Sequence, residues 1–178
     1  MGFVGFGATA RYLFALLKPF DCQALVCDPY VGDLPEGAER CQNLETLFER
    51  SEVITIQCGL TEQTTGMIGK HLLRRMKPNA ILVNTARGGI FGEAELIEFL
   101  RERPDVFAGL DVFEKEPLPA DSPLRRMRNV ICYPHSVGSG GEQAEQYIIE
   151  QAARNIRAFC TGGKLDAVIT AEKYDLMT

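Results

Sequence analysis

The stretch Gly2-Phe3-Val4-Gly5-Phe6-Gly7-Ala8-Thr9-Ala10 decides the fold of this chain. A short apolar strand ends at Gly5, and the pattern Gly5-x-Gly7-x-x-Ala10 leads directly into a helix-like segment. In a turn of this kind the first glycine makes the tight bend, the second lets the backbone approach a pyrophosphate, and the third position needs a small residue. The helix start adds free N–H groups and a partial positive charge. The stretch predicts a dinucleotide site; the alternative is a glycine-bearing turn without a ligand.

An acidic residue at the end of the second expected strand strengthens this prediction. Asp28 follows the apolar run Ala24–Cys27 and lies about 20 residues beyond the glycine turn, where a carboxylate accepts hydrogen bonds from an adenosine ribose. Because a negative charge there repels a 2′-phosphate, the sequence favours NAD over NADP. The alternative for Asp28 is a turn or helix-cap residue before Pro29.

Short apolar runs alternate with helical patterns along the rest of the chain. The expected strands are 3–4, 24–27, 53–56, 80–83, 106–110 and 130–133, and the expected helices lie near 12–17, 44–48, 70–76, 96–100 and 144–159. Apolar runs without alternation are typical of strands buried on both faces. Strand–helix repetition predicts a doubly wound parallel α/β sheet, a Rossmann fold, with ligands at the carboxyl ends of the strands.

The composition is that of an ordinary globular protein. The chain has 178 residues, of which 46% are hydrophobic and 24% charged, with a net charge of −5. This balance argues against nucleic-acid binding, and no apolar run approaches the roughly 20 residues that a membrane span needs. Six cysteines without a CxxC pair, together with only two histidines, favour buried free thiols in a reducing, cytoplasmic compartment over a disulfide framework or a metal site.

Three polar segments follow apolar strands and contain the candidate catalytic residues. Arg87, beside paired glycines, can offer its planar guanidinium to a carboxylate or a carbonyl oxygen. Pro117 restricts the preceding Glu116 to an extended backbone, which fixes the direction of its carboxylate. His135 follows the last strand, and a nearby Glu116 would favour its protonated form near neutral pH. The alternatives are a surface arginine, a solvated acidic loop and a structural histidine.

These three residues together suit hydride transfer between NAD(H) and a 2-oxo acid. Protonated His135 would donate to the carbonyl oxygen, Glu116 would stabilise the imidazolium, and Arg87 would bind the substrate carboxylate. General acid–base catalysis of this kind contributes roughly 10²–10⁴-fold in rate. The hydride chemistry belongs to the cofactor.

A set of ordered motifs extends from residue 5 to about residue 169. It comprises Gly5-Phe6-Gly7, Asp28-Pro29, Met76-Lys77-Pro78, Val83–Gly89, Leu110–Phe113, Glu116-Pro117 and Pro134-His135. The set resembles the NAD-dependent D-isomer-specific 2-hydroxyacid dehydrogenases, the group that contains phosphoglycerate, glycerate/hydroxypyruvate and D-lactate dehydrogenases. The resemblance implies an oxidoreductase acting on a small D-2-hydroxy or 2-oxo acid, with catalytic Arg87, Glu116 and His135, and a homodimer.

The resemblance also implies which residues contact the cofactor. Gly5, Gly7, Ala8 and Thr9 match positions at the pyrophosphate, and Asp28 matches the ribose position. The remaining cofactor-binding matches, mostly on the nicotinamide side, are Cys58, Thr64, Thr85, Ala86, Arg87, Asp111, His135, Ser136, Val137 and Gly138. No metal ligand is implied.

The chain departs from the family pattern in several places. Ala10 replaces the commoner third glycine, Gln57-Cys58-Gly59 stands where a His-x-Pro-like segment is frequent, and Gly92 replaces a frequent aspartate. The expected division is a dinucleotide-binding domain over 1–164 and a tail over 165–178 that returns to a substrate domain. The resemblance thus implies that most of the substrate domain lies outside this sequence, and we expect NAD binding with poor turnover.

Two other functions stay open at this point. The resemblance extends to transcriptional corepressors that dimerise in response to NAD(H), so an NAD(H)-sensing interaction module is the alternative function. The departures at Gln57–Gly59 and Gly92 also allow a doubly wound domain whose pocket is degenerate.

Overall fold

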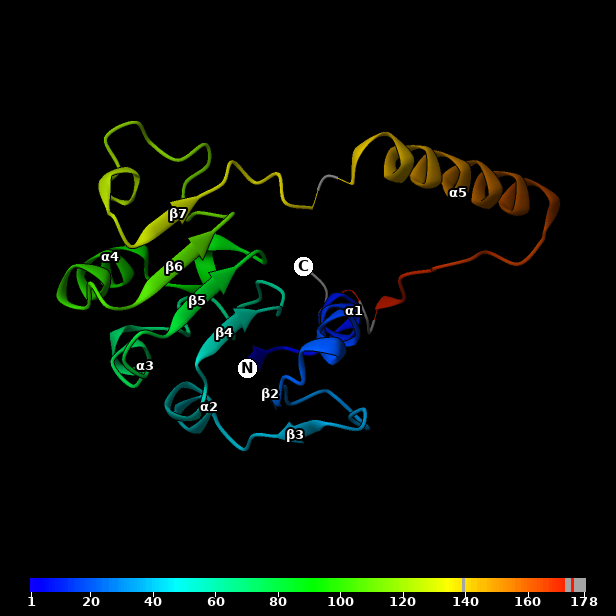
Figure 1. The fold of residues 1–178 in the computed structure, drawn as a ribbon. Coiled ribbons are helices and arrows are strands. Elements are labelled where there is room, and N and C mark those ends of the chain that lie inside the picture. Colours follow the sequence, from blue (N-terminus) through cyan, green and yellow to red (C-terminus); the bar gives the residue numbers. More distant parts are fainter. Residues whose placement is uncertain (139, 172–173, 175–178) are drawn as a thin grey trace.

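The computed structural model describes residues 1–138, 140–171 and 174 (Figure 1). Within them, seven parallel strands form one sheet in the order β3-β2-β1-β4-β5-β6-β7. The strands are β1 (Gly2–Val4), β2 (Ala24–Cys27), β3 (Ala38–Arg40), β4 (Val53–Ile56), β5 (Ile81–Asn84), β6 (Phe107–Leu110) and β7 (Val130–Cys132). The predicted doubly wound α/β fold is confirmed.

Helices connect these strands. The α-helices are α1 (Ala8–Leu17), α2 (Leu44–Arg50), α3 (Lys70–Leu73), α4 (Glu93–Glu102) and α5 (Gly141–Thr161), and the 3-10 turns are η1 (Lys18–Phe20), η2 (Gly88–Ile90) and η3 (Pro123–Arg126). Asn43 caps α2, because its side chain accepts the Thr46 N–H at 2.8 Å. Gly162, with φ at +67°, ends α5 in the left-handed conformation that glycine adopts at little cost.

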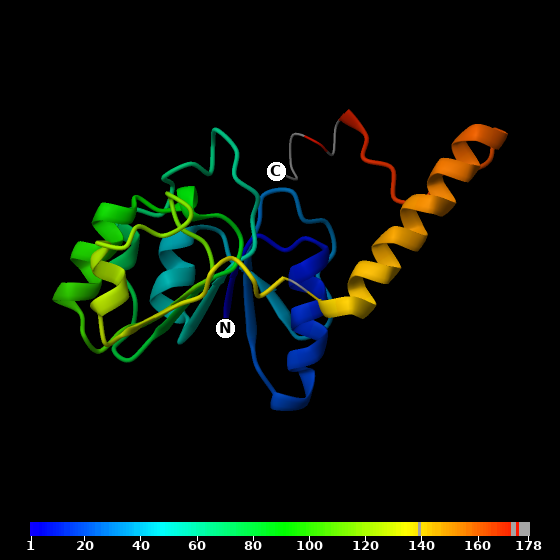
Figure 2. The same ribbon diagram turned by 90° about the horizontal axis from the view of Figure 1, so that it is seen from above.

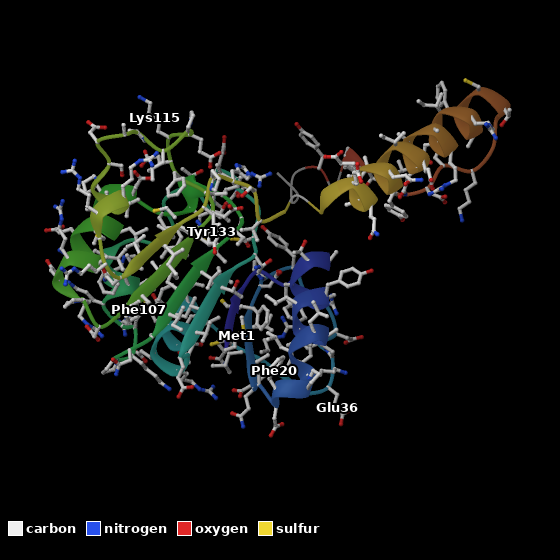
Figure 3. All side chains as sticks on the ribbon, turned by 45° about the horizontal axis from the view of Figure 1, so that its top comes forward. Met1, Phe20, Glu36, Phe107, Lys115 and Tyr133 are labelled. Carbon is white, nitrogen blue, oxygen red and sulfur yellow. The ribbon has the colours of Figure 1, made fainter. Side chains whose placement is uncertain are left out.

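The direction of the strands places all their carboxyl ends at one edge of the sheet. In Figure 3, Phe107 marks the start of β6 at the opposite edge, whereas Lys115 after β6 and Tyr133 after β7 lie on the carboxyl side. The segments after β1, β2, β5, β6 and β7 contain most of the predicted site residues. The fold therefore gathers residues that are far apart in sequence along one edge.

Two apolar clusters pack against the sheet. α1 covers one face at β1 and β2, where Phe3 packs edge-to-face against Phe6 and Phe14 with ring centroids 5.4 Å and 6.4 Å apart. The larger cluster lies on the other face, beneath α2, α3 and α4. Fully burying a phenylalanine side chain stabilises a fold by about 1.5–3 kcal/mol. The glycine turn between β1 and α1 thus rests on a rigid core.

One face of β5, β6 and β7 is open, so the expectation that every strand is buried on both faces is wrong there. Ile81, Phe107 and Ile131 are 42%, 50% and 61% exposed. Ile81 pairs with Phe107, and Gly109 pairs with Ile131, so these side chains share one face. The reason is that α1 packs over β1 and β2, while α5 extends away from the sheet (Figures 1 and 2).

Two local differences from the sequence-based expectations have simple causes. β3 was not expected, because Ala38-Glu39-Arg40 is a short, charged edge strand whose composition is that of a loop. α3 ends at Leu73 instead of near Met76, because the chain tightens after it: the N–H groups of Arg75 and Met76 bond to carbonyls three residues back, those of Leu72 and Leu73.

All six cysteines are free thiols, but not all are buried. Cys41 is buried, whereas Cys22 and Cys160 are exposed, so the expected burial is wrong for these two. Cys22 lies in the loop after η1, and Cys160 lies on α5, none of whose residues is buried.

The exposed side chains of α5 include Tyr147, Ile148, Ile149, Ile156 and Phe159. No helix in the described part of the chain is long and apolar enough to cross a membrane. The division between 1–164 and 165–178 stays a prediction, and residues 172–173 and 175–178 of that tail lie outside the described residues.

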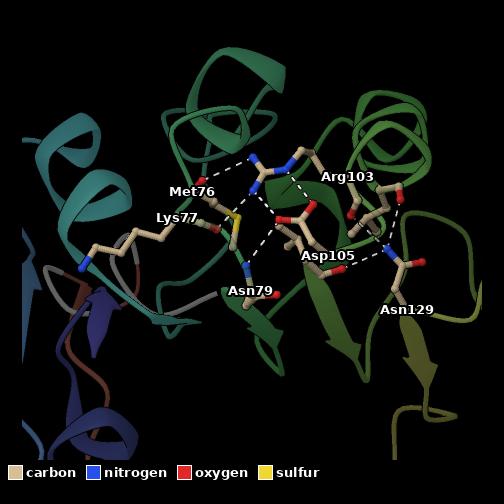
Figure 4. Close-up of polar contacts among 8 residues, drawn as sticks. Met76, Lys77, Asn79, Arg103, Asp105 and Asn129 are labelled. Carbon is tan, nitrogen blue, oxygen red and sulfur yellow. Dashed lines mark hydrogen bonds and ion pairs between the residues drawn. The ribbon is translucent and has the colours of Figure 1, made fainter.

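A polar network joins α4 to the amino-terminal edge of the sheet (Figure 4). Arg103 donates from Nε and Nη2 to the two carboxylate oxygens of Asp105, at 2.9 Å and 2.7 Å, and also to the Lys77 carbonyl at 3.2 Å. The hydrogen bond from Arg103 is the main cause that lowers the pKa of Asp105 to about 2. The carboxylate therefore stays charged through the whole range in which proteins are usually handled.

Asn129→Ala is expected to lower the free energy of unfolding by about 1–3 kcal/mol. The Asn129 amide nitrogen donates to the carbonyls of Leu100 (3.0 Å), Arg103 (3.3 Å) and Val106 (2.9 Å), and Asn129 is only 8% exposed. Its removal leaves buried acceptors without a donor. Urea unfolding measures the loss. Asn155→Ala, which removes two exposed bonds with the backbone of Asp166, is the control, and an equal loss in both variants would contradict the prediction.

Candidate active site

The turn after β1 has the geometry of a phosphate-binding site. Gly5 has φ at +86°, and a Cβ at this position would lie 2.7 Å from the Cys58 backbone nitrogen, so only glycine fits. A Cβ at Gly7 would meet nothing within 4 Å, which leaves room for a ligand against the backbone. Ala8 and Thr9 begin α1 and are exposed, and no side chain caps this helix. Its first N–H groups are therefore free to bind an anion.

Asp28 lies beside this turn and ties it to the loop after β2. Its Oδ2 accepts the Phe6 N–H at 2.6 Å, and its Oδ1 accepts the N–H groups of Tyr30 and Val31 at 2.8 Å and 3.1 Å. A carboxylate has about four acceptor positions, so capacity for a sugar hydroxyl remains. A cavity of about 520 Å³ adjoins it, lined among others by Cys27, Pro29, Cys41, Met67 and Leu72. This volume lies within the range of ligand pockets.

The loop after β4 faces the glycine turn. Cys58 is partly buried, and burial raises the pKa of its thiol to about 11, so it is neutral near pH 7. Thr64 is engaged within the loop, since its hydroxyl donates to the Gly59 carbonyl at 2.7 Å and accepts the Thr61 N–H at 2.7 Å. Thr64 can therefore offer a cofactor only an acceptor.

The turn after β5 carries Thr85, Ala86 and Arg87. Asn84, which is 1% exposed, holds this turn: its Oδ1 accepts the Ala86 N–H and its Nδ2 donates to the Arg87 carbonyl, both at 3.0 Å. The Arg87 side chain is exposed, and its Nη1 donates to the Ala86 carbonyl at 2.7 Å. Its guanidinium retains further donors for an acidic ligand.

Glu116 and His135 meet at the carboxyl edge from the segments after β6 and β7. His135 Nδ1 lies 2.6 Å from Glu116 Oε2, and Glu116 Oε1 accepts the Phe113 N–H at 3.0 Å. An ionised carboxylate can only accept, so Nδ1 carries the proton in this contact, and Nε2 is the other ring nitrogen available for chemistry. The side chains of His135 and Glu116 are 51% and 34% exposed, within reach of a ligand.

The Glu116 carboxylate is stabilised by its neighbours. Burial alone would raise the pKa of Glu116. The hydrogen bonds from His135 and from the Phe113 N–H, together with the charges of His135 and Arg87, outweigh burial and lower that pKa. The charge of Arg87 contributes least to this shift. The turn that carries Arg87 touches the loop that carries Glu116, because a Cβ on Gly88 would lie 1.9 Å from the Phe113 carbonyl carbon, so the three candidate catalytic residues lie on neighbouring segments.

Asp111 organises the segment that carries His135. Asp111 is 3% exposed, and its two carboxylate oxygens accept the N–H groups of Ser136 (2.9 Å) and Val137 (3.2 Å). Its carbonyl accepts the His135 N–H at 2.9 Å. His135 has φ at +53°, a conformation that is uncommon outside glycine and that these bonds maintain. Gly138 follows, exposed, with open space at its Cβ position.

His135→Ala is expected to raise the pKa of Glu116, because burial then acts with less opposition. Arg87→Ala should raise it less, since Arg87 acts by charge alone. A pH titration of the Glu116 carboxyl by ¹³C NMR measures both. In the wild type the pair stabilises the fold above the ordinary glutamate pKa of 4.5, and this contribution is lost as the pH falls through the lowered value. An unchanged Glu116 pKa in His135→Ala would contradict the prediction.

The carboxyl edge brings together two groups of predicted residues. One contains the glycine turn, Asp28 and Cys58, and the other contains Arg87, Glu116 and His135. Sequence reasoning missed the turn-holding role of Asn84, although an asparagine at a strand end is a known signal of such turns. The sequence also did not predict the contact of Glu93, whose Oε2 accepts the Glu114 N–H. In the described residues, no three side chains of the metal-binding types gather to hold an ion.

Residues 1–137 match the family described as D-isomer specific 2-hydroxyacid dehydrogenase, NAD binding domain. The chain belongs to this family of oxidoreductases, as the sequence motifs predicted. Nothing in the comparisons supports a corepressor-type module. Curated relatives include a glyoxylate reductase of Korarchaeum cryptofilum, 38% identical over 91% of this chain and 49% of that protein. An (S)-sulfolactate dehydrogenase of Chromohalobacter salexigens is 40% identical over 82% of this chain and 48% of its own length.

Solved structures show the same fold. A D-isomer specific 2-hydroxyacid dehydrogenase from Xanthobacter autotrophicus Py2, in complex with NADPH and MES, superposes with a TM-score of 0.84 at 28% identity, covering 97% of this chain and 71% of that one. D-lactate dehydrogenase with NAD+ from Lactobacillus jensenii gives 0.82 at 27% identity, covering 95% and 55%. The chain thus spans about half the length of the curated relatives it matches, and its structural neighbours bind either nicotinamide dinucleotide.

Proposed function

We propose that this chain is the coenzyme-binding part of an oxidoreductase that transfers a hydride between NAD(H) and a small D-2-hydroxy or 2-oxo acid. The contact between His135 Nδ1 and Glu116 Oε2, at 2.6 Å beside Arg87, is the observation that carries the proposal. An imidazole held by a carboxylate can donate a proton to a carbonyl oxygen, and a guanidinium can bind the carboxylate of the same substrate, so these residues suit the reduction of a 2-oxo acid. When bound, the nicotinamide supplies the hydride.

Each catalytic residue has a separate role. His135 donates a proton from Nε2 to the substrate carbonyl oxygen, and in the reverse direction it accepts the proton there. Glu116 orients the ring through Nδ1 and stabilises its positive charge. Arg87 binds the substrate carboxylate and polarises the carbonyl.

The cofactor-binding assignments follow the carboxyl edge. The glycine turn, with Ala8 and Thr9, binds the pyrophosphate, and Asp28 binds the ribose beside the cavity. On the nicotinamide side we assign Cys58, Thr64, Thr85, Ala86, Asp111 and the residues from His135 to Gly138. Because both Asp111 oxygens hold the backbone of that last segment, Asp111 acts there mainly through Ser136 and Val137.

Calorimetric titration with NADH and an assay of NADH oxidation with glyoxylate as the 2-oxo acid test the proposal. We expect NADH to bind. A full-length form of the enzyme should oxidise NADH with a 2-oxo acid, and His135→Ala should slow this reaction by about 10²–10⁴-fold. Absence of NADH binding, or full activity in the His135 variant, would reject the proposed function.

We further propose that the cofactor is NAD rather than NADP. The negative charge of Asp28 adjoins the site of the ribose and would repel a 2′-phosphate. Asp28→Asn, which keeps an acceptor oxygen for the Phe6 N–H, is expected to narrow the preference for NADH over NADPH by about tenfold, or about 1.4 kcal/mol. Parallel titrations of both cofactors measure this ratio. An unchanged ratio would show that Asp28 does not discriminate.

A homodimer and a cytoplasmic location complete the proposal. The open face at Ile81, Phe107 and Ile131, and the exposed apolar side chains of α5, offer surface for association with a second copy. Light scattering of the protein, with Ile131→Glu as the comparison, tests the dimer: a monomer in the wild type would reject it. The free thiols support a reducing compartment.

A further inference from the structure

The segment that carries Glu116 is tied to the first turn of α4. Glu93, the first residue of that helix, accepts the Glu114 N–H at Oε2 at a distance of 3.0 Å. The preceding amide, Phe113 N–H, donates in the other direction along the segment, to Glu116 Oε1 at 3.0 Å. Two successive amides of one short loop thus bind two different carboxylates.

The same loop lies against the turn that carries Arg87. A Cβ on Gly88 would lie 1.9 Å from the Phe113 carbonyl carbon and 2.5 Å from the Glu114 nitrogen, so the two backbones touch. This steric contact limits how closely the Glu116 loop can approach the Arg87 turn, but it does not hold the loop there. The hydrogen bond from the Glu114 N–H to Glu93 Oε2 connects this loop to α4.

The orientation of Glu116 depends on this tie. Glu116 Oε1 accepts the Phe113 N–H while Oε2 contacts His135 Nδ1, so the bond from Phe113 restricts the orientation in which the carboxylate meets the imidazole. The N–H groups of Phe113 and Glu114 belong to two adjacent peptide planes that share the Phe113 Cα, so a displacement of the Glu114 plane also displaces one side of Phe113. Holding the Glu114 N–H on Glu93 therefore restrains the neighbouring Phe113 N–H, which is the donor that orients the Glu116 carboxylate.

We propose that Glu93 is a positioning residue for the Glu116–His135 pair, acting through the Glu114 amide. The inference rests on the proposed function, in which that pair carries the proton. Within the described part of the chain, Glu93 makes no hydrogen bond or ion pair with His135 or Arg87, so it would act on the pair only through the loop. Its carboxylate also suits the amino-terminal end of α4, where negative charge is favourable.

A positioning role and a direct charge effect of Glu93 predict opposite changes in the pKa of Glu116 when Glu93 is replaced. Removing a nearby negative charge favours ionisation of Glu116 and would lower its pKa. Loosening the loop weakens the hydrogen bonds from Phe113 and His135 that lower this pKa, and would raise it. The sign of the change at Glu116 therefore separates a positioning role from a through-space charge effect.

The test is a pH titration of the Glu116 carboxyl by ¹³C NMR in the 178-residue chain, with Glu116→Gln assigning the resonance. Glu93→Ala removes the acceptor, and Glu93→Asp keeps the charge but shortens the reach, which covers the case in which the alanine variant does not fold. Glu93→Gln keeps an acceptor oxygen. Glu95→Ala is the matched control, because Glu95 lies in the same helical turn and accepts the Lys70 N–H at 2.6 Å in the same manner.

We expect Glu93→Ala and Glu93→Asp to raise the Glu116 pKa by about 0.5 or more, and Glu93→Gln and Glu95→Ala to leave it within about 0.2 of the wild type. Amide exchange at Glu114 should quicken in the first two variants only. An unchanged or lower Glu116 pKa in both Glu93→Ala and Glu93→Asp, or an equal rise in Glu95→Ala, overturns the proposal.

Failure of this inference can be told apart from failure of the proposed function. His135→Ala shifts the Glu116 pKa if the pair exists, whatever Glu93 does. If His135→Ala shifts it and Glu93→Ala does not, the pair stands and only the role of Glu93 is rejected. If NADH does not bind the wild type, the proposed function is rejected, while the titration of Glu116 still measures whether Glu93 positions the Glu116–His135 pair.

Discussion

Replacing Gly88 with alanine is expected to lower the free energy of unfolding by about 3 kcal/mol or more. The added methyl would lie 1.9 Å from the Phe113 carbonyl carbon and 2.0 Å from its oxygen. These are backbone atoms of a loop that Glu93 and Glu116 already hold, so they cannot move aside without breaking those bonds. A total stability of about 5–15 kcal/mol makes this loss a large fraction.

Urea unfolding of Gly88→Ala and Gly89→Ala measures this effect. Gly89 is the matched control, because a Cβ there meets only the methyl groups of Leu60, at 3.3 Å and 3.4 Å, and that side chain can shift. If the two variants lose the same stability, the close contact between the Arg87 turn and the Glu116 loop is not a constraint on the fold.

Replacing Gly7 with alanine is expected to weaken NADH binding by about tenfold or more, about 1.4 kcal/mol, with stability unchanged within about 0.5 kcal/mol. A Cβ at Gly7 meets no protein atom within 4 Å, so the fold tolerates it. The methyl would instead occupy the space that a pyrophosphate needs at the start of α1.

Gly5→Ala should behave in the opposite way. Gly5 has φ at +86°, and its Cβ would meet the Cys58 backbone at 2.7 Å, so this variant should lose stability directly. Calorimetric titration with NADH, paired with urea unfolding, measures both variants. Wild-type affinity in Gly7→Ala would show that no pyrophosphate lies on this turn.

The glycine turn between β1 and α1 explains why much of the fold could be predicted. Gly5 and Gly7 mark a strand–turn–helix unit whose residue spacing is set by backbone geometry. The apolar runs that follow alternate with helical segments, which is the pattern of a parallel α/β sheet. Six of the seven described strands were expected within a residue or two at each end. The seventh, β3, has the polar composition of an edge strand, which hydropathy cannot tell from a loop.

The candidate site was only partly accessible to such reasoning. Arg87, Glu116 and His135 each follow an apolar run, so parallel topology alone places them at one edge. The bonds of Glu93 and Asp111 to backbone amides were not predictable, because each depends on where an N–H of another loop lies. The bonds of Asn84 lie within its own turn, and the asparagine at the end of β5 was a signal that could have been used.

The amino-acid sequence by itself determined the parallel α/β class, the phosphate turn and the family, because these depend on local periodicity and on residue types at set spacings. Only the tertiary structure decided which groups are in contact. It shows that Glu116 contacts His135, that the Asp111 carboxylate accepts hydrogen bonds from backbone N–H groups, and that one face of β5–β7 is exposed. These features depend on distances between segments far apart in the chain. Such distances follow from packing of the whole domain, which no local pattern records.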